Sequence, residues 1–209
     1  MSLFTIRAGR LEDQAAAYHI CLKTGDHGKD GEPFYRDDPD ALGRIFVGPY
    51  LEYEPELSLM LEDAQGVCGY AFGAFDSRSF YDRYDREWRP RLCAEFARPT
   101  GDPAKWTRAQ TVHSWYHRPD YFTPDPYEAY PSHMHIDLLE RARGCGWGRR
   151  MMEMVMDKLR QRGSPGVHLG VSVLNTPALG FYAKLGFREL VRVGTPIDGC
   201  IYLGKPLKN

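Results

Sequence analysis

The chain has 209 residues, of which 43% are hydrophobic and 26% charged, so it can bury one substantial core, and we expect a single domain over residues 1–209. The formal net charge of −1 gives no electrostatic reason to expect nucleic acid or a membrane surface as a partner. The five cysteines lack C-x-x-C spacing and no apolar run approaches ~20 residues, so disulfide frameworks, zinc ribbons and membrane spans are not indicated, and a cytoplasmic protein is expected.

Hydrophobic periodicity predicts how the first part of the chain is organised. Apolar residues alternate along the first of three segments that we expect to be strands, and the third is apolar along most of its length. In two other segments apolar residues recur at helical spacing. The predicted strands are 4–8, 57–62 and 67–76, and the predicted helices are 11–22 and 41–47. The Gly-Pro pair at 48–49 is expected to break the second helix. The last two strands are expected to pair antiparallel in the middle of the sheet.

The segment 23–35 is rich in glycine and charge and is predicted to be a loop. In one interpretation it faces a substrate, and Asp26, His27 and Tyr35 contact an acceptor. A plain solvated connection is the other interpretation. A calcium loop is disfavoured because Gly28 offers no side-chain ligand and Asp37 stands where such loops carry glutamate.

The region 77–130 is predicted to be an aromatic-rich insertion. Segments 77–97 and 103–117 show helical patterns, and a proline-broken loop follows them. Most of the aromatic rings are expected to pack these helices onto the sheet. In the alternative interpretation the loop 115–127, which begins at Trp115, forms one wall of a substrate site.

Three ionisable side chains occupy one face of the strand that follows this insertion. His133, His135 and Asp137 alternate with period two. An iron site built from two histidines and a carboxylate needs a facial geometry that one straight strand does not give. His113 and His117 stand four residues apart but lack the glutamate of a zinc-peptidase helix. We therefore expect no bound metal.

A glycine-rich turn joins a predicted strand, 134–139, to a helix with a buried apolar stripe that reaches residue 159. The turn and the start of the helix consist of Arg143, Gly144, Cys145, Gly146, Trp147, Gly148, Arg149 and Arg150. Glycines leave the first amides of the helix uncovered, so these amides, the helix dipole and the arginines can hold a diphosphate. The spacing excludes a Walker loop, which needs Lys-Ser or Lys-Thr, and a dinucleotide fingerprint, which needs glycine where Met151 stands.

The last third of the chain is predicted to contain three more strands and one helix. The strands are 167–173, 187–193 and 199–203. Asn175 can cap the intervening helix and Gly186 can end it. Ala178 and Tyr182 lie on the same face of that helix as Asn175.

The two glycine-containing motifs together resemble one known superfamily. Arg143-x-x-Gly146-x-Gly148 between strand and helix, followed at about the usual distance by segment 175–187, is similar to the GCN5-related N-acetyltransferases (GNAT). The resemblance implies an α/β (α+β) fold with a central mixed, mostly antiparallel twisted sheet of about seven strands flanked by helices. Here a helical insertion precedes the cofactor-binding strand. The resemblance also implies acetyl-CoA as cofactor and an amine as acceptor, either a small molecule or a protein lysine.

Further stretches, at 24–35, 47–50, 61–73 and 181–186, resemble more narrowly the acetyltransferase-like C-terminal domain of the O-GlcNAcases. Because 209 residues cannot also hold a glycosidase domain, a free-standing bacterial relative is expected. In the animal domain the glycine-rich loop is degenerate, whereas the loop is intact here, so the comparison implies cofactor binding.

The superfamily resemblance implies that the pantetheine arm lies between two splayed strands and pairs with exposed backbone groups. The implied cofactor-binding residues are Leu138, Leu139, Arg143, Gly144, Cys145, Gly146, Trp147, Gly148, Arg149, Asn175, Ala178 and Tyr182. Two alternatives remain open at this point, a pseudo-acetyltransferase that binds acetyl-CoA or a peptide without turnover, and a purely structural interaction domain.

The resemblance also implies roles for three side chains in acetyl transfer. Tyr182 matches the general acid of the family, because a phenol stays protonated near neutral pH and can donate a proton to a departing thiolate. Asp137 and His135 are the candidates for the base that takes the proton of the amine. Asp26, Tyr35 and Trp115 are the candidate substrate contacts.

Overall fold

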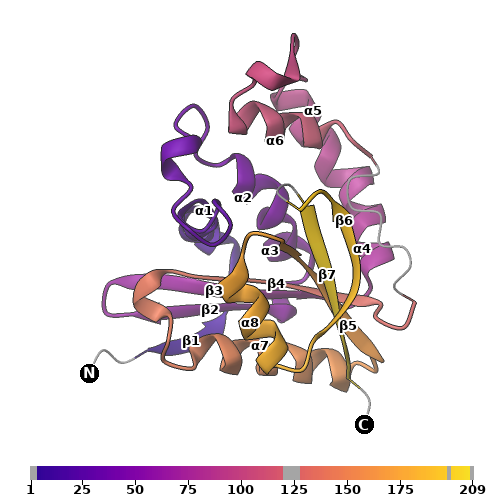
Figure 1. Ribbon diagram of the computed structural model, residues 1–209. Helices are drawn as coiled ribbons and strands as arrows, with labels where there is room; N and C mark the ends of the chain where they lie inside the picture. The colour runs from indigo at the N-terminus through magenta and orange to yellow at the C-terminus, as the bar shows by residue number, and fades with distance from the viewer. Residues whose placement is uncertain (1–3, 120–127, 197–198, 208–209) are drawn as a thin grey trace.

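A computed structural model describes residues 4–119, 128–196 and 199–207 (Figure 1). Seven strands form one sheet in the order β1-β2-β3-β4-β5-β7-β6, in which only β4 and β5 run parallel. The strands are β1 Thr5–Ala8, β2 Ser58–Asp63, β3 Gly66–Ala74, β4 Ser132–Leu138, β5 Gly166–Ser172, β6 Arg188–Gly194 and β7 Gly199–Pro206. The predicted mixed, mostly antiparallel sheet of about seven strands is confirmed.

Eight α-helices lie in the described part of the chain. They are α1 Gln14–Lys23, α2 Ala41–Phe46, α3 Gly48–Tyr53, α4 Ser77–Arg83, α5 Arg89–Glu95, α6 Arg108–Tyr116, α7 Trp147–Gln161 and α8 Thr176–Lys184. In Figure 1 the insertion helices α5 and α6 lie at the top of the molecule, and both chain ends lie at the bottom. Among the helices described, none is both long and apolar enough to cross a membrane.

The sheet separates two apolar clusters, because alternate residues of a strand point to opposite faces. Met60, Tyr70 and Phe72 point to the side covered by α1, α2, α3 and the insertion helices. Leu61 and Ala71 point to the opposite side, where α7 and α8 pack. Gly73 permits the close approach of α7, since a Cβ atom there would lie 2.7 Å from Val155.

Most predicted elements are present, with three differences of physical interest. The helix after the glycine-rich turn begins at Trp147, earlier than the predicted Arg149. The Gly-Pro pair at 48–49 does end α2, but the chain enters a new helix at once because proline is tolerated in a first turn. The predicted helix over 77–97 is interrupted by a π-helical turn, Tyr84–Trp88. Such turns accommodate one extra residue within a helix.

Candidate active site

The parallel pair β4 and β5 separates soon after it begins. Only Ser132 pairs with Val167, and His133 with His168. Beyond these pairs, β4 continues to Leu138 bonded to β3 alone, whereas β5 continues to Ser172 bonded to β7 alone. In the described sheet, the backbone groups of the outer half of β4 that face β5 therefore have no strand partner, and an extended ligand can pair with them.

The glycine-rich loop lies directly after the free end of β4. Gly144 and Gly146 have positive φ angles of 78° and 83°, and a Cβ atom at either position would meet nothing within 4 Å. No side chain caps α7, whose N-cap is Gly146, so the first amides of the helix remain directed at the open side of the loop. This arrangement suits a diphosphate, because both the amides and the helix dipole favour negative charge there.

The arginines of the loop are engaged within the chain. Arg143 donates to the carbonyl oxygens of Leu138 at 2.8 Å and Gly28 at 3.0 Å. Arg149 donates to the carbonyl oxygen of Lys184 at 3.1 Å and pairs with Glu153 at 3.2 Å. In the structure the predicted cradle consists of backbone amides, and Arg143 connects the loop to β4 and to segment 24–31.

Two of the predicted backbone contacts are also used internally. The N–H of Leu139 donates to Cys68 at 2.8 Å, so it continues the pairing with β3 and does not face β5. The carbonyl oxygen of Leu138 accepts from Arg143. The expectation that Leu139 offers its amide to a ligand is therefore wrong for this conformation, because that amide already has a β3 acceptor.

The side chains around the start of α7 differ in their surroundings. The ring of Trp147 contacts that of Phe4, with centroids 5.5 Å apart, and the guanidinium of Arg150 lies 5.5 Å from the Trp147 ring centroid. Gly148 is buried, and a Cβ atom there would lie 3.1 Å from Leu138. Cys145 is exposed and free. The contacts of Trp147 and Gly148 therefore fix the position of the backbone at the start of α7.

Helix α8 borders the other side of the gap. Asn175 caps it by accepting a hydrogen bond from the N–H of Ala178 at 3.2 Å. At the far end Gly186 has a φ of 84°, and the N–H of Phe187 donates to Tyr182, which is the Schellman pattern predicted for this position. Tyr182 is 7% exposed. Burial, and then the negative charge of Asp137, raise the pKa of Tyr182, so the phenol stays protonated at neutral pH.

The ionisable groups of β4 meet a tyrosine from β3 that the sequence did not single out. Tyr70 lies opposite Asp137 in the strand register, and its Oη donates to Oδ2 of Asp137 at 2.5 Å. The same Oη lies 2.9 Å from Nε2 of His135, which is 3.3 Å from Oδ2 of Asp137. Tyr70 is fully buried and stacks on Phe72 with centroids 4.4 Å apart. The rigid phenol therefore fixes both β4 side chains.

The hydrogen-bond pattern defines where protons reside in this cluster. A phenol has one proton, and Tyr70 gives it to the acceptor-only carboxylate of Asp137. Toward His135 the phenol oxygen can then only accept, so Nε2 of His135 carries the hydrogen of that bond. The lone pair of the imidazole is left on Nδ1. His135 and Asp137 are 30% and 21% exposed, so both reach the surface and can exchange protons with a ligand.

Segment 24–31 lies across the gap and joins its two sides. The carbonyl oxygen of Gly28 accepts a hydrogen bond from Arg143. A Cβ atom at Gly28 would lie 2.8 Å from the side-chain amide nitrogen of Asn175. His27, whose φ is 53°, contacts Ser172 at the end of β5, Nδ1 to Oγ 2.8 Å. This segment is therefore positioned to contact whatever occupies the gap.

The predicted substrate contacts in this region have different surroundings. Asp26 binds Arg108 of α6 at 2.7 Å and is 20% exposed on its side chain. Tyr35 is only 5% exposed and belongs to the apolar cluster beneath the segment. Its predicted contact with an acceptor is not supported by its position, because the ring faces the core.

The third predicted contact, Trp115, is separated from His135 by the ring of Phe46. Its indole meets Phe46 edge-on with centroids 6.3 Å apart, and Phe46 stacks on His135 at 6.3 Å. The rest of the predicted loop wall, residues 120–127, lies outside the described residues. In the part that is described, an aromatic surface adjoins the acid–base cluster.

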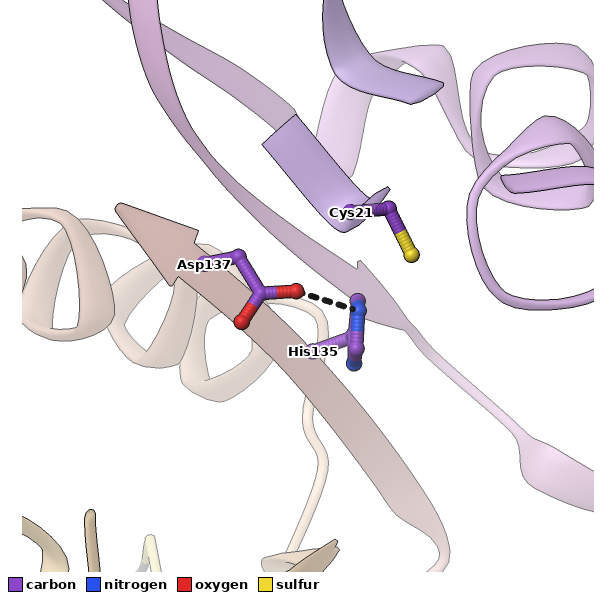
Figure 2. A group of neighbouring side chains, drawn as sticks. All are labelled: Cys21, His135 and Asp137. Carbon is purple, nitrogen blue, oxygen red and sulfur yellow. Dashed lines mark ion pairs between the residues drawn. The ribbon is translucent and has the colours of Figure 1, made fainter. Parts of the chain in front are cut away.

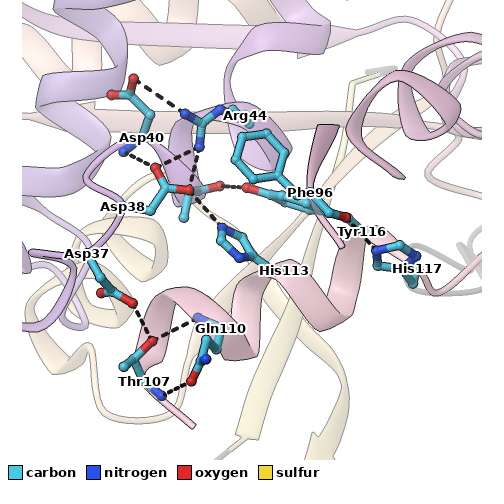
Figure 3. A network of polar contacts seen from close by, with 11 residues as sticks. Asp37, Asp38, Asp40, Arg44, Phe96, Thr107, Gln110, His113, Tyr116 and His117 are labelled. Carbon is cyan, nitrogen blue, oxygen red and sulfur yellow. Dashed lines mark hydrogen bonds and ion pairs between the residues drawn. The ribbon is translucent and has the colours of Figure 1, made fainter. Parts of the chain in front are cut away.

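A polar network holds α6 against α2 and thereby places Trp115 (Figure 3). Asp38 accepts two hydrogen bonds from Nη1 of Arg44, at 2.7 and 2.8 Å, and lies 2.7 Å from Nε2 of His113. Tyr116 donates to the carbonyl oxygen of Ala41 at 2.6 Å. His117 lies 2.9 Å from the carbonyl oxygen of Phe96, so the two histidines of α6 and its C-cap have separate partners.

Comparison with curated proteins places the whole chain beside part of a larger protein. Over 207 residues, covering 98% of this chain, it is 30% identical to the Protein O-GlcNAcases of Rattus norvegicus and Mus musculus. The chain spans about a fifth, 22%, of the length of these relatives.

Solved structures agree with the fold and extend the comparison. The crystal structure of SsHAT matches with a TM-score of 0.88 and 35% identity, covering 99% of both chains. The structure of yncA from Salmonella typhimurium, solved with its cofactor acetyl-CoA, matches with a TM-score of 0.56 and 16% identity over 98% of this chain and 94% of that chain, which supports the fold alone. Residues 29–187 match the Acetyltransferase (GNAT) family. The chain therefore belongs to the GNAT family of acetyltransferases.

Proposed function

We propose that this protein is an N-acetyltransferase that moves an acetyl group from acetyl-CoA to an amine, by direct attack within a ternary complex. The observation that carries the proposal is the cluster of His135 and Asp137 on β4, which borders the β4–β5 gap, with Tyr70 on the adjacent strand β3. Acid–base groups, an open strand edge and an uncovered helix start converge there.

The gap and the loop fit the donor. The free edge of β4 offers backbone groups to an extended pantetheine arm, and the amides around Cys145 and Trp147 offer donors to its diphosphate. Bound acetyl-CoA supplies the activated acetyl group. The residues of this chain then hold that group beside β4, and segment 24–31 and the Phe46–Trp115 pair lie beside it and limit the access of water.

The acid–base groups can handle the protons of the transfer. The attacking amine must be uncharged, and either the carboxylate of Asp137 or Nδ1 of His135 takes its proton, directly or through a water. Tyr70 keeps both groups in place through its hydrogen bonds to them. Tyr182, protonated because of its burial and the nearby charge of Asp137, supplies a proton to the departing thiolate.

A second candidate is a module that binds acetyl-CoA or a peptide without turnover. It is favoured by the internal engagement of Arg143 and Leu139, since these groups do not face a ligand in this conformation. It predicts coenzyme binding with no release of thiol.

Two measurements separate the candidates. Calorimetric titration with acetyl-CoA tests the donor site, and thiol release with pooled small amines and lysine peptides tests turnover. We expect binding and amine-dependent release, and we expect Asp137→Asn to bind acetyl-CoA normally while losing most of the release. Binding with no release for any amine supports the binding module, and absence of acetyl-CoA binding overturns both the enzyme and a module that binds the coenzyme.

A further inference from the structure

Three side chains of different chemistry converge beside the proposed acid–base cluster. Cys21 comes from α1, and His135 and Asp137 come from β4, far away in the sequence. Their Sγ, imidazole nitrogen and carboxylate oxygen all lie within 4.8 Å of one another. Figure 2 shows the thiol above the strand, directed to the same space as the imidazole and the carboxylate. Such a juxtaposition is invisible in the spacing of the sequence.

A thiolate, an imidazole and a carboxylate are ligands that zinc accepts together. Zinc bonds of about 2.3 Å to sulfur and about 2.0–2.1 Å to nitrogen and oxygen place neighbouring ligand atoms about 3.3–3.7 Å apart in a tetrahedron. Nε2 of His135 and Oδ2 of Asp137 are already 3.3 Å apart. The sulfur needs to approach by roughly 1 Å at most, which a small rotation of the Cys21 side chain provides.

Tyr70 completes the set of donor atoms. Its Oη contacts both His135 and Asp137, at 2.9 and 2.5 Å, and so lies among the three ligand atoms. In a ligand-free cluster, these hydrogen bonds hold the part-exposed His135 and Asp137 against the buried phenol and give its hydroxyl its partners. A cation that enters replaces them, and the phenol oxygen becomes a fourth ligand or yields its place to a water.

We propose that Cys21, His135 and Asp137 form a binding site for Zn²⁺. The soft sulfur ligand favours zinc over magnesium and calcium, which prefer all-oxygen sites. Cys21 is 4% exposed, so the ion reaches it from the surface through His135 and Asp137, which are 30% and 21% exposed. On binding, the Sγ–H bond of Cys21 breaks and its proton leaves to solvent, while the proton on Nε2 of His135 is lost and Nδ1 takes one up from solvent. Sγ–Zn and Nε2–Zn bonds form in place of the two bonds to hydrogen.

Zinc bound at this site would affect catalysis, and this part of the inference rests on the proposed function. A zinc ion bound to Oδ2 of Asp137 and Nε2 of His135 occupies the carboxylate, and it leaves the proton of the imidazole on Nδ1, so neither group is free to accept the proton of the amine. Zinc occupancy and acetyl transfer are therefore mutually exclusive, and zinc acts as an inhibitor of the enzyme at the acceptor side of its site.

Cobalt tests the site directly, since Co²⁺ occupies zinc sites and its bond to a thiolate gives a near-ultraviolet charge-transfer band. The full chain, stripped of metal, is titrated with Co²⁺ and then with Zn²⁺. We expect one Co²⁺ per chain with a thiolate band that Zn²⁺ abolishes. Cys21→Ser should lose the band, whereas Cys145→Ser, which removes the exposed thiol, should keep it.

A second ligand variant guards against misfolding of the buried Cys21 position. His135→Ala alters a part-exposed residue and should weaken Co²⁺ binding at least tenfold while its circular dichroism stays native. No band in the wild type, or an equal band in Cys21→Ser, overturns the metal site. The cobalt titration measures binding without any substrate, so a chain that proves inactive in acetyl transfer leaves the result for the site unaffected.

Discussion

The phenol of Tyr70 donates to the carboxylate of Asp137, Oη to Oδ2 2.5 Å, across the register of β3 and β4. Tyr70→Phe removes this donor and frees both Asp137 and His135 from a fixed position. A hydrogen bond to a charged group is worth about 1.5–3 kcal/mol, so we expect kcat/KM to fall roughly 10- to 100-fold. Because the lost bond positions the base and does not touch the coenzyme, the loss should appear in kcat, and KM for acetyl-CoA should stay near the wild-type value.

The matched control for that prediction is Tyr18→Phe. Tyr18 is another buried tyrosine, on α1, and has no hydrogen bond or ring contact with the β4 cluster in the described structure. We expect its kcat and KM to match the wild type. A Tyr70→Phe enzyme with the wild-type kcat, or one in which only KM for acetyl-CoA changes, would remove the positioning role of Tyr70.

The second prediction concerns the uncovered amides at the start of α7. Gly146→Ala places a methyl group beside these amides at a φ of 83°, where a side chain is strained. We expect acetyl-CoA affinity, measured by calorimetry, to fall by roughly tenfold or more, which corresponds to about 1.4 kcal/mol. Gly101→Ala introduces the same strain at a φ of 85° in a loop outside the site, where a Cβ atom also meets nothing.

Both glycine variants should lose about 1–2 kcal/mol of folding stability from the left-handed backbone. Only Gly146→Ala should lose affinity as well. Equal affinity in the two variants would mean that the coenzyme diphosphate binds elsewhere.

Local patterns predicted the parts of the fold that local physics determines. The apolar run of β3, the apolar stripe of α7 and the Asn175 cap with Gly186 at the other end of α8 each depend on a few neighbouring residues, and all are present. The helix α3 was missed because Gly48-Pro49 indicates a break, and a break does not say whether the next element is a helix or a loop.

Contacts between distant segments could not be predicted in the same way. The sequence placed His135 and Asp137 on one face of β4, and the alternation of β3 placed Tyr70 with Phe72, but the register that puts Tyr70 opposite Asp137 depends on the pairing of the two strands. The hydrogen bond from Arg143 to the carbonyl oxygen of Gly28 likewise depends on where segment 24–31 crosses the gap. Tyr35 is buried because the segment around it packs on the apolar cluster. The polar composition of that segment gives no sign of this packing.

The third prediction tests Tyr182 as the proton donor. Tyr182→Phe keeps the ring that packs with Phe187, centroids 5.8 Å apart, and removes only the hydroxyl. We expect kcat to fall roughly 100-fold, a typical contribution of a general acid, while the Kd for acetyl-CoA stays within about twofold. Thiol release and calorimetry measure the two quantities. Unchanged kcat would show that another group or solvent protonates the thiolate.

The fourth prediction arises from a buried histidine at the junction of β4 and β5. The hydroxyl of Ser77 donates to the carbonyl oxygen of Pro131 at 2.7 Å, so toward Nδ1 of His133, also at 2.7 Å, it can only accept. His133 therefore carries its proton on Nδ1, and its buried Nε2 has no partner. Burial, and then the neighbouring His168 and His135, lower the pKa of His133 well below 6.5.

This lowered pKa makes folding stability depend on pH. Below pH 6.5 the unfolded chain binds a proton at His133, whereas the folded chain leaves this histidine neutral. The free energy of unfolding should therefore fall as pH drops, by at most about 1.4 kcal/mol per pH unit for this group. His133→Asn keeps a donor for Ser77 and removes the titrating nitrogen. Urea unfolding between pH 7.5 and 5 should therefore give a shallower pH dependence in this variant, whatever its absolute stability. His19→Asn, at an exposed position, should keep the wild-type slope, and equal slopes in both variants would contradict the assignment.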